Sequence, residues 1–176
     1  MAYGIGLVFD PHTEARIREV WDRLTQHGFR TPLARPGCLP HVSLLLAETL
    51  QVDDVVRDLE RRGACSHGME VRLSHIGVFP TPDLVIFYGL TPTDRLLRLH
   101  ADLIRRSCCW RAALTVGTHA GVWVPHCTLA TQVDARRVAD AFAAAATLPL
   151  PWVVPQMRLA LVQFDRERVD LVRRFS

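Results

Sequence analysis

The strongest constraint on the fold of this chain is a short pattern that occurs twice, once in each half. Residues 40–44 read Pro-His-Val-Ser-Leu, and residues 125–129 read Pro-His-Cys-Thr-Leu. Both patterns lie in apolar runs typical of β-strands, at residues 39–47 and 124–131. Because side chains alternate along a strand, the histidine and the hydroxyl two positions later share one face. Each strand is therefore predicted to present one imidazole and one hydroxyl on one face and apolar side chains on the other.

The segments that precede the two patterns also repeat. An apolar run at 3–9 leads to Asp10, a proline and a helical pattern, and an apolar run at 84–90 leads to Thr91, a proline and a second helical pattern. An oxygen-bearing side chain followed by proline is typical of a helix start. Asp10 and Thr91 are therefore predicted to cap two helices. The chain reads as two copies of strand, helix and histidine strand.

A repeat of this size indicates two similar lobes, because a solenoid would need three or more short units. About four helices and seven or eight strands are expected, with many hairpins and strand–helix–strand returns, which favours an α+β fold with antiparallel-rich sheets. The length of 176 residues predicts a single domain over 1–176. Within the first strand, bulky residues alternate with Gly4, Gly6 and Val8. Such a thin strand face often lets a ligand or another backbone approach closely.

Composition excludes several classes of protein. A hydrophobic fraction of 49% and a charged fraction of 22% are ordinary for a soluble globular chain. The net charge of +3 allows a polyanionic partner without indicating one, although all 21 basic residues are arginine. No apolar run is long enough to span a membrane, so we expect no membrane partner.

The cysteines argue for a reducing compartment. The chain has five, at positions 38, 65, 108, 109 and 127. Their number is odd, they lack a CxxC spacing, and no signal peptide precedes them, which favours a cytoplasmic location. Zinc binding by Cys65 and His67 with Cys108-Cys109 is the alternative, but this spacing matches no common pattern. We therefore expect no metal site.

The two histidine strands suggest acid–base chemistry if the lobes pack about a pseudo-twofold axis. His41 and His126 would then face each other across one groove. The unperturbed pKa of histidine is about 6.5, so near neutral pH one imidazole can accept a proton while the other donates one. Each proton transfer is worth roughly 10²–10⁴-fold in rate. The hydroxyls of Ser43 and Thr128 could hold the non-bridging oxygens of a phosphate.

Three alternatives fit the pattern less well. A nucleophilic Ser43 would need its own base and a sharp turn such as GxSxG, and a straight strand offers neither. A metal held by the two histidines would need a third ligand that neither pattern contains. The third alternative is that both histidines are buried groups that serve stability alone, and two matched repeats argue against it.

The sequences His41-Val42-Ser43 and His126-Cys127-Thr128 resemble the two His-x-(Ser/Thr) signatures of the two-histidine phosphoesterases. This superfamily includes the 2′-5′ RNA ligases and cyclic nucleotide phosphodiesterases. The similarity extends to residues 7–11, 76–80 and 84–100, which look like the opening and middle of the bacterial RNA-ligase-like branch. The resemblance implies two antiparallel sheets related by a pseudo-twofold axis, with the motif residues in a central cleft.

The resemblance also implies an activity. It suggests metal-independent hydrolysis of a 2′,3′-cyclic phosphate without a cofactor, and in some members reversible 2′-5′ ligation of RNA ends. His126 would be the base that activates water, and His41 the acid for the leaving ribose oxygen. The second signature often continues to an arginine in this branch, whereas this chain has Thr131. This departure puts RNA-end ligation most in doubt.

A catalytically weak module that binds nucleotides or RNA remains the alternative function. In either case the partner is a nucleotide or an RNA end, and we expect a monomer. Aromatic side chains beside a phosphate cleft often stack on nucleobases. Phe9, Phe79 and Trp123 are candidates, because each lies at a strand end next to a motif, with core packing as the alternative for each.

Overall fold

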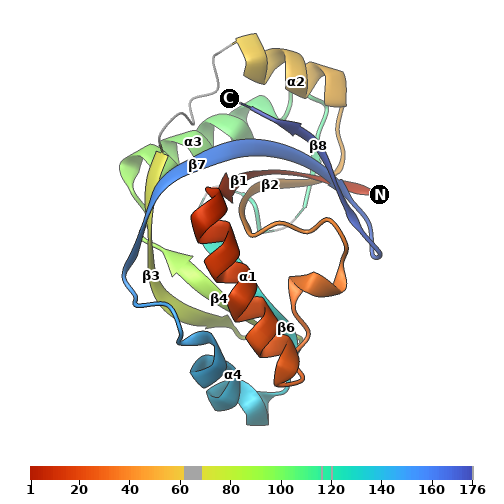
Figure 1. Cartoon of the computed structure of the whole chain (residues 1–176). Helices are drawn as coiled ribbons and strands as arrows, with labels where there is room; N and C mark the ends of the chain where they lie inside the picture. The colour runs from red at the N-terminus through yellow and green to blue at the C-terminus, as the bar shows by residue number, and fades with distance from the viewer. Residues whose placement is uncertain (62–68, 116, 120, 176) are drawn as a thin grey trace.

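The computed structural model describes residues 1–61, 69–115, 117–119 and 121–175. These residues form eight β-strands, four α-helices and two short 3-10 helices (Figure 1). The strands are β1 (Ala2–Phe9), β2 (His41–Thr49), β3 (Met69–Phe79), β4 (Leu84–Leu90), β5 (Ala113–Leu114), β6 (His126–Val133), β7 (Trp152–Phe164) and β8 (Val169–Arg174). The α-helices are α1 (Pro11–Gln26), α2 (Val52–Arg61), α3 (Asp94–Arg106) and α4 (Val138–Ala145), and the 3-10 helices are Pro32–Ala34 and Ala135–Arg137.

The expected α+β class with antiparallel strands is confirmed. The strands form one sheet in the order β5-β2-β1-β7-β3-β4-β6, with β8 paired to β7, and every pair is antiparallel. The order β2-β1-β7 is mirrored by β6-β4-β3, as expected for a duplicated unit. Where two sheets were expected, the lobes are two halves of one sheet. The reason is β7, whose 13 residues are long enough to pair with β3 at one end and with β1 at the other.

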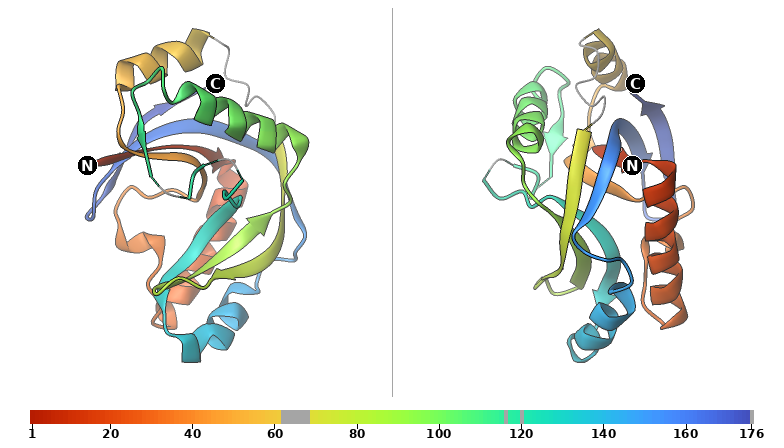
Figure 2. Two further views of the ribbon diagram at one scale, coloured as in Figure 1. Left: turned by 180° about the vertical axis from the view of Figure 1, so that it is seen from behind. Right: turned by 60° about the vertical axis from the view of Figure 1, so that its left-hand side comes forward.

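The sheet curls so strongly that its two histidine strands meet. Four strands lie between β2 and β6 in the sheet, yet β2 and β6 are in contact. Figures 1 and 2 show β7 arching over this fold, with β1 and β2 on one side and β3, β4 and β6 on the other. The curl therefore brings together two motifs that are 85 positions apart in the sequence (126 minus 41).

Helix α1 begins where the sequence predicts. The carboxylate of Asp10 accepts hydrogen bonds from the backbone N–H groups of His12 and Thr13, each 3.0 Å long, and a proline occupies the first turn. The buried face of the helix packs against the sheet. From this face Trp21 donates a 3.0 Å hydrogen bond from Nε1 to the carbonyl oxygen of Thr128, which ties the first helix to the second motif strand.

Helix α3 begins two residues later than expected. The capping residue is Thr93, whose hydroxyl oxygen accepts a 3.3 Å hydrogen bond from the N–H of Leu96. The predicted cap, Thr91, is wrong, because its own N–H is bonded to the carbonyl oxygen of Arg72 at 2.9 Å. Thr91 therefore still belongs to the hydrogen-bonding pattern between β3 and β4. No helix among the described residues is long and apolar enough to cross a membrane.

Candidate active site

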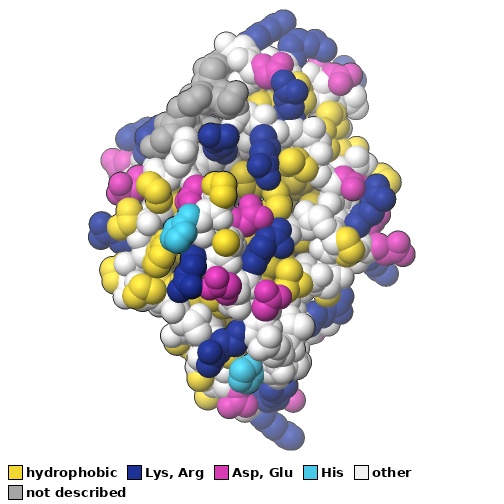
Figure 3. Space-filling model, viewed as in Figure 1, with side chains coloured by type: hydrophobic (Ala, Val, Ile, Leu, Met, Phe, Trp, Pro, Cys, Tyr) yellow, Lys and Arg dark blue, Asp and Glu magenta, His cyan; other side chains and the backbone are white. Residues whose placement is uncertain are grey.

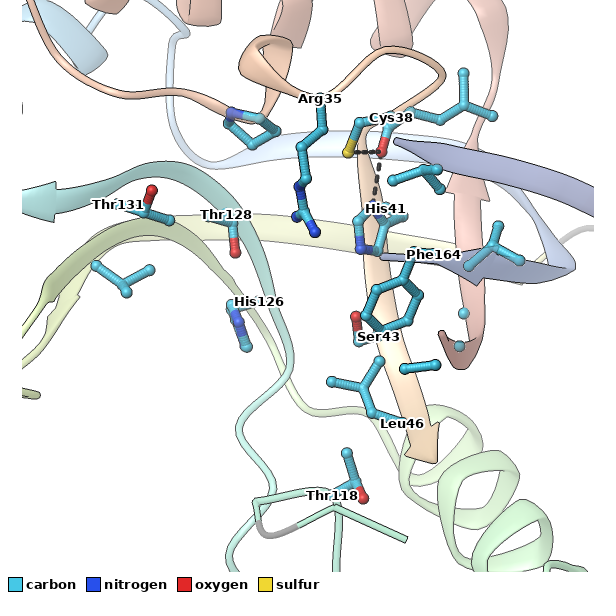
Figure 4. Close-up of a pocket in the computed structure, with 18 of the residues that line it drawn as sticks. Arg35, Cys38, His41, Ser43, Leu46, Thr118, His126, Thr128, Thr131 and Phe164 are labelled. Atoms are coloured by element: carbon cyan, nitrogen blue, oxygen red, sulfur yellow. Dashed lines mark hydrogen bonds between the residues drawn. The ribbon is translucent and has the colours of Figure 1, made fainter. Parts of the chain in front are cut away.

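Both motif strands show the predicted alternation. Facing the core are Val42, Leu44, Cys127 and Leu129, none of them more than 1% exposed. The four residues of the opposite face, His41, Ser43, His126 and Thr128, are half-buried and line one cleft. The cleft has a volume of about 1110 Å³ and is walled by both lobes. Figure 4 shows that β2 carries one pair and β6 the other, on either side of this space.

The two imidazoles are held by equivalent hydrogen bonds. Nδ1 of His41 lies 2.6 Å from the carbonyl oxygen of Leu39, and Nδ1 of His126 lies 2.7 Å from that of Val124. A carbonyl oxygen only accepts, so Nδ1 carries the proton and Nε2 is left for a substrate. The proline before each histidine contributes to this geometry, because it biases the preceding residue toward an extended backbone. The repeated Pro-His pattern thus positions two equivalent Nε2 atoms.

Burial favours the neutral form of both histidines. It lowers the pKa of His41 below its ordinary value of 6.5, while the hydrogen bond to Leu39 opposes this shift and the nearby charge of Arg35 adds to it. Burial likewise lowers the pKa of His126, with partial opposition from the hydrogen bond to Val124. Each histidine is therefore ready to accept a proton before a substrate binds.

Aromatic rings support His126 from the side of its own lobe. The rings of Phe79 and Phe87 lie edge-on to the imidazole, with centroids 4.8 and 5.3 Å away, and stack on each other at 4.2 Å. Gly77 of β3 pairs with Phe87 and makes room for this cluster, because a Cβ at position 77 would collide with the Phe87 ring. Of the aromatic candidates, Phe79 thus lines the cleft and touches a motif histidine.

The other two aromatic candidates lie in different surroundings. Trp123 lines the cleft, stacks on His100 with ring centroids 4.1 Å apart, and donates a 2.8 Å hydrogen bond from Nε1 to the carbonyl oxygen of Ser43. Phe9 is 5% exposed, packs within the core and is not among the residues that line the cleft. Core packing therefore accounts for Phe9.

A cation that the motifs do not predict completes the site. Arg35 lies in the loop before β2, and its guanidinium points into the cleft toward the space between His41 and Thr128 (Figure 4). The residue is half-buried, and its guanidinium makes no hydrogen bond or ion pair with the residues that the structure describes. An unpaired guanidinium in a cleft suits a bound phosphate, because its fork of N–H groups matches phosphate oxygens.

The position of Arg35 depends on two distant contacts of its loop. The N–H of Val169 on β8 donates a 2.9 Å hydrogen bond to the carbonyl oxygen of Pro36. Gly37 follows with a φ of 79°, and a Cβ at this position would lie against the carbonyl oxygen of Val169. From the other side, Arg18 of α1 donates a 3.1 Å hydrogen bond to the carbonyl oxygen of Cys38. No local pattern in the sequence could have signalled this placement.

The residues of the alternative zinc site are only partly covered by the structure. Cys65 and His67 lie outside the described residues. The cysteines that are described, Cys38, Cys108, Cys109 and Cys127, are free thiols. Within the described ranges, no three side chains of His, Cys, Asp or Glu are grouped as metal ligands would be. On the face shown in Figure 3, basic and acidic side chains are interspersed, so this face offers no broad basic surface.

The sequence of the chain matches a known protein family. The model of the 2′-5′ RNA ligase superfamily matches residues 9–168. The chain belongs to this superfamily. The match includes both motif strands and the loop that carries Arg35. No curated protein sequence matches the chain.

Solved structures share the fold of this superfamily member. TT0787 of Thermus thermophilus superposes with a TM-score of 0.69 at 18% identity, over 100% of this chain and 97% of that one. E. coli LigT in complex with 3′-AMP superposes with a TM-score of 0.58 at 17% identity, over 99% of this chain and 97% of that one. E. coli LigT in complex with NADP+ superposes with a TM-score of 0.54 at 17% identity, over 98% and 95%. At these identities the likeness concerns the fold.

Proposed function

We propose that the protein is a phosphodiesterase that hydrolyses 2′,3′-cyclic phosphates, at RNA ends or on small nucleotides, with His41 and His126 as acid and base. One observation carries the proposal. Two histidines from opposite lobes line one cleft, and each imidazole is fixed by an equivalent hydrogen bond from Nδ1 that leaves Nε2 for the substrate. Membership of the 2′-5′ RNA ligase superfamily supports an enzyme that acts on phosphodiester bonds. The nucleotides bound by LigT support a nucleotide as substrate.

The reaction needs two proton transfers across the phosphorus atom. Nε2 of His126 accepts a proton from water as the water oxygen forms its bond to phosphorus. The bond from phosphorus to the ribose 3′ oxygen breaks, and Nε2 of His41 donates its proton to that oxygen. The product is a 2′-phosphate with a free 3′ hydroxyl. After one turnover His126 is protonated and His41 is neutral. Proton exchange with solvent restores the starting state.

The surroundings of the histidines fit these roles. The lowered pKa of His126 supplies a neutral base. His41 must be protonated to act as the acid, and the negative charge of a bound cyclic phosphate favours its imidazolium form. Ser43 and Thr128 supply neutral donors to the non-bridging oxygens, and Arg35 supplies a charged one. Related chains often carry an arginine at the position of Thr131. In this chain Arg35 supplies the positive charge that Thr131 lacks.

The deciding experiment measures product from a nucleoside 2′,3′-cyclic phosphate in the presence of EDTA. Turnover by the wild type, and its loss in His41→Ala and His126→Ala, supports the proposal. Chromatography of the product distinguishes a 2′-phosphate from a 3′-phosphate. Binding of a nucleotide without turnover would instead favour the nucleotide- or RNA-binding module. A screen with RNA carrying a 2′,3′-cyclic phosphate and a free 5′ hydroxyl end tests ligation in the same samples.

A further inference from the structure

We infer that one end of the cleft is a nucleobase subsite formed by Gly4, Leu46, Val162 and Phe164. These four residues, termed the apolar wing, line the cleft beside the motif residues of β2. The inference rests on the proposed function and extends it, because it names the part of the substrate that sets binding strength. It also gives a role to the thin face of β1, which the catalytic residues leave unexplained.

The apolar wing is built from three adjacent strands. Gly4 of β1 is paired with Leu46 of β2 on one side and with Val162 of β7 on the other. A Cβ at Gly4 would lie 3.2 Å from Cγ2 of Val162, 3.3 Å from Cδ2 of Leu46 and 3.6 Å from Cε1 of Phe164. The three side chains thus converge over the glycine and form a low apolar surface. A larger residue at position 4 would push them into the cleft.

The apolar wing lies beside the phosphate-binding hydroxyl. Two positions further along β1, Gly6 is paired with Ser43 and with Ala160. The surface between the wing and the hydroxyl of Ser43 is therefore also formed by small residues. A Cβ at Gly6 would lie 2.7 Å from the carbonyl oxygen of Val42, which excludes any side chain there. Two strand residues span roughly 7 Å. This is about the span of a ribose between its 2′ and 3′ oxygens and its base.

The opposite end of the cleft has a different chemistry. Leu46 stands five residues after His41, and the matching position after His126 is Thr131. Around Thr131 the cleft lining includes charged and amide side chains together with Val85 of β4, and Nη1 of Arg30 donates a 2.8 Å hydrogen bond to Gln132. An apolar ring loses its hydration more favourably against the wing than against these groups. The asymmetry therefore orients the substrate, with its base toward Phe164.

The wing predicts the kind of base that is selected. None of its three side chains carries a hydrogen-bond donor or acceptor, so the wing cannot read the edge of a base. It offers contact to the flat face of a ring, which every base has, and a purine has more face than a pyrimidine. The ligand class is therefore a 2′,3′-cyclic phosphate that bears an aromatic base, with purines preferred and weak discrimination within each class.

The test compares 2′,3′-cyclic AMP, 2′,3′-cyclic UMP and methyl riboside 2,3-cyclic phosphate, which lacks a base. For the wild type, KM should rise in that order. Phe164→Ala should raise KM for cyclic AMP by about 10-fold, with a much smaller effect for the riboside, and should leave kcat nearly unchanged. Val172→Ala is the matched control, because Val172 lies on β8 of the same hairpin and is 37% exposed. Phe164→Leu replaces Phe164→Ala if circular dichroism shows that the alanine variant does not fold.

The outcomes separate this inference from the proposed function. Turnover with equal KM values for cyclic AMP and the riboside, or a Phe164→Ala variant with wild-type KM, would overturn the subsite and leave the phosphodiesterase intact. If no cyclic phosphate is turned over, calorimetric titration with adenosine 2′-monophosphate still decides. Weaker binding to Phe164→Ala than to wild type and Val172→Ala supports the subsite, and equal binding overturns it.

Discussion

The indole of Trp123 donates a 2.8 Å hydrogen bond from Nε1 to the carbonyl oxygen of Ser43. Trp123 precedes His126 by three residues, so the segment that leads into the second motif is bonded directly to the strand of the first. The flat stack of the indole on His100, with planes 7° apart, holds this bridge from the other side. One side chain therefore links two half-sites that belong to different lobes.

Trp123→Phe should impair catalysis more than binding. Phenylalanine keeps a ring on His100 and loses the bond to Ser43, so the free energy of unfolding should fall by about 1 kcal/mol. Because proton transfer depends on the separation of the two histidines, kcat should fall by more than KM rises. Trp152→Phe is the control, since Nε1 of Trp152 has no hydrogen-bond partner among the described residues. Equal kcat losses in both variants would show that the bond to Ser43 does not matter.

His41→Ala and His126→Ala should each lower kcat on a cyclic phosphate by on the order of 10²–10⁴-fold. The double variant should lose little more than either single variant, because the two imidazoles act in one step. Ser43→Ala and Thr128→Ala should lose less, since each removes one neutral hydrogen bond to phosphate. The Tm of each variant is measured by circular dichroism alongside the kinetics. Large losses of Tm with retained turnover would mean that the histidines serve stability alone.

The pH dependence of kcat/KM should be a bell displaced to the acid side of 6.5. This profile reports the free enzyme, in which burial lowers the pKa of both His41 and His126. The profile of kcat should lie at higher pH, because bound phosphate favours the imidazolium form. Arg35→Gln should move the limb that belongs to His41 to higher pH, since a removed positive charge no longer opposes protonation.

The same Arg35→Gln variant should also raise KM, through the lost charged contact to phosphate. Arg57→Gln removes an equal charge from α2, where the side chain is 59% exposed, and serves as the control. An unchanged KM and an unchanged pH profile in Arg35→Gln would remove Arg35 from the site.

Acid should destabilise the fold partly through His100. Its side chain is 4% exposed, Nε2 lies 2.8 Å from the carbonyl oxygen of Thr118, and burial lowers its pKa below 6.5. Below 6.5 the unfolded chain therefore binds more protons than the folded one, so stability is lost as pH falls through that range. In His100→Phe the drop in unfolding free energy between pH 7.5 and 5 should be smaller than in wild type.

Urea titrations at the two pH values measure this difference. His12→Phe is the matched control, because His12 is exposed and also stacks on a tryptophan, with ring centroids 5.9 Å apart. At pH 7.5 His100→Phe should itself lose about 1 kcal/mol, since the carbonyl of Thr118 loses its donor. An equal acid-induced drop in wild type and His100→Phe would exclude this histidine as a source of acid sensitivity.

Local patterns in the sequence determined the motif strands and their faces. Alternation alone assigned His41 and Ser43 to one side of a strand and Val42 to the other, because the period of a strand is strictly two residues. The cap at Asp10 was likewise readable, since Asp is favoured at the N-cap and proline at the first helical position. The same reasoning gave the wrong cap at Thr91. Threonines stand on both sides of Pro92, and a long-range hydrogen bond from Thr91 to Arg72 leaves Thr93 to cap the helix.

Only the tertiary structure decided what surrounds the motifs. One sheet forms where two were expected, because β7 pairs with both lobes, and no periodicity specifies how far a strand extends its pairing. Arg35 reaches the cleft because β8 and α1 hold its loop, and the apolar wing arises from three strands in register. Phe164 and Gly4 are 160 positions apart in the sequence (164 minus 4). Such contacts depend on strand register and loop path, which are set by packing over the whole chain rather than by any local stretch.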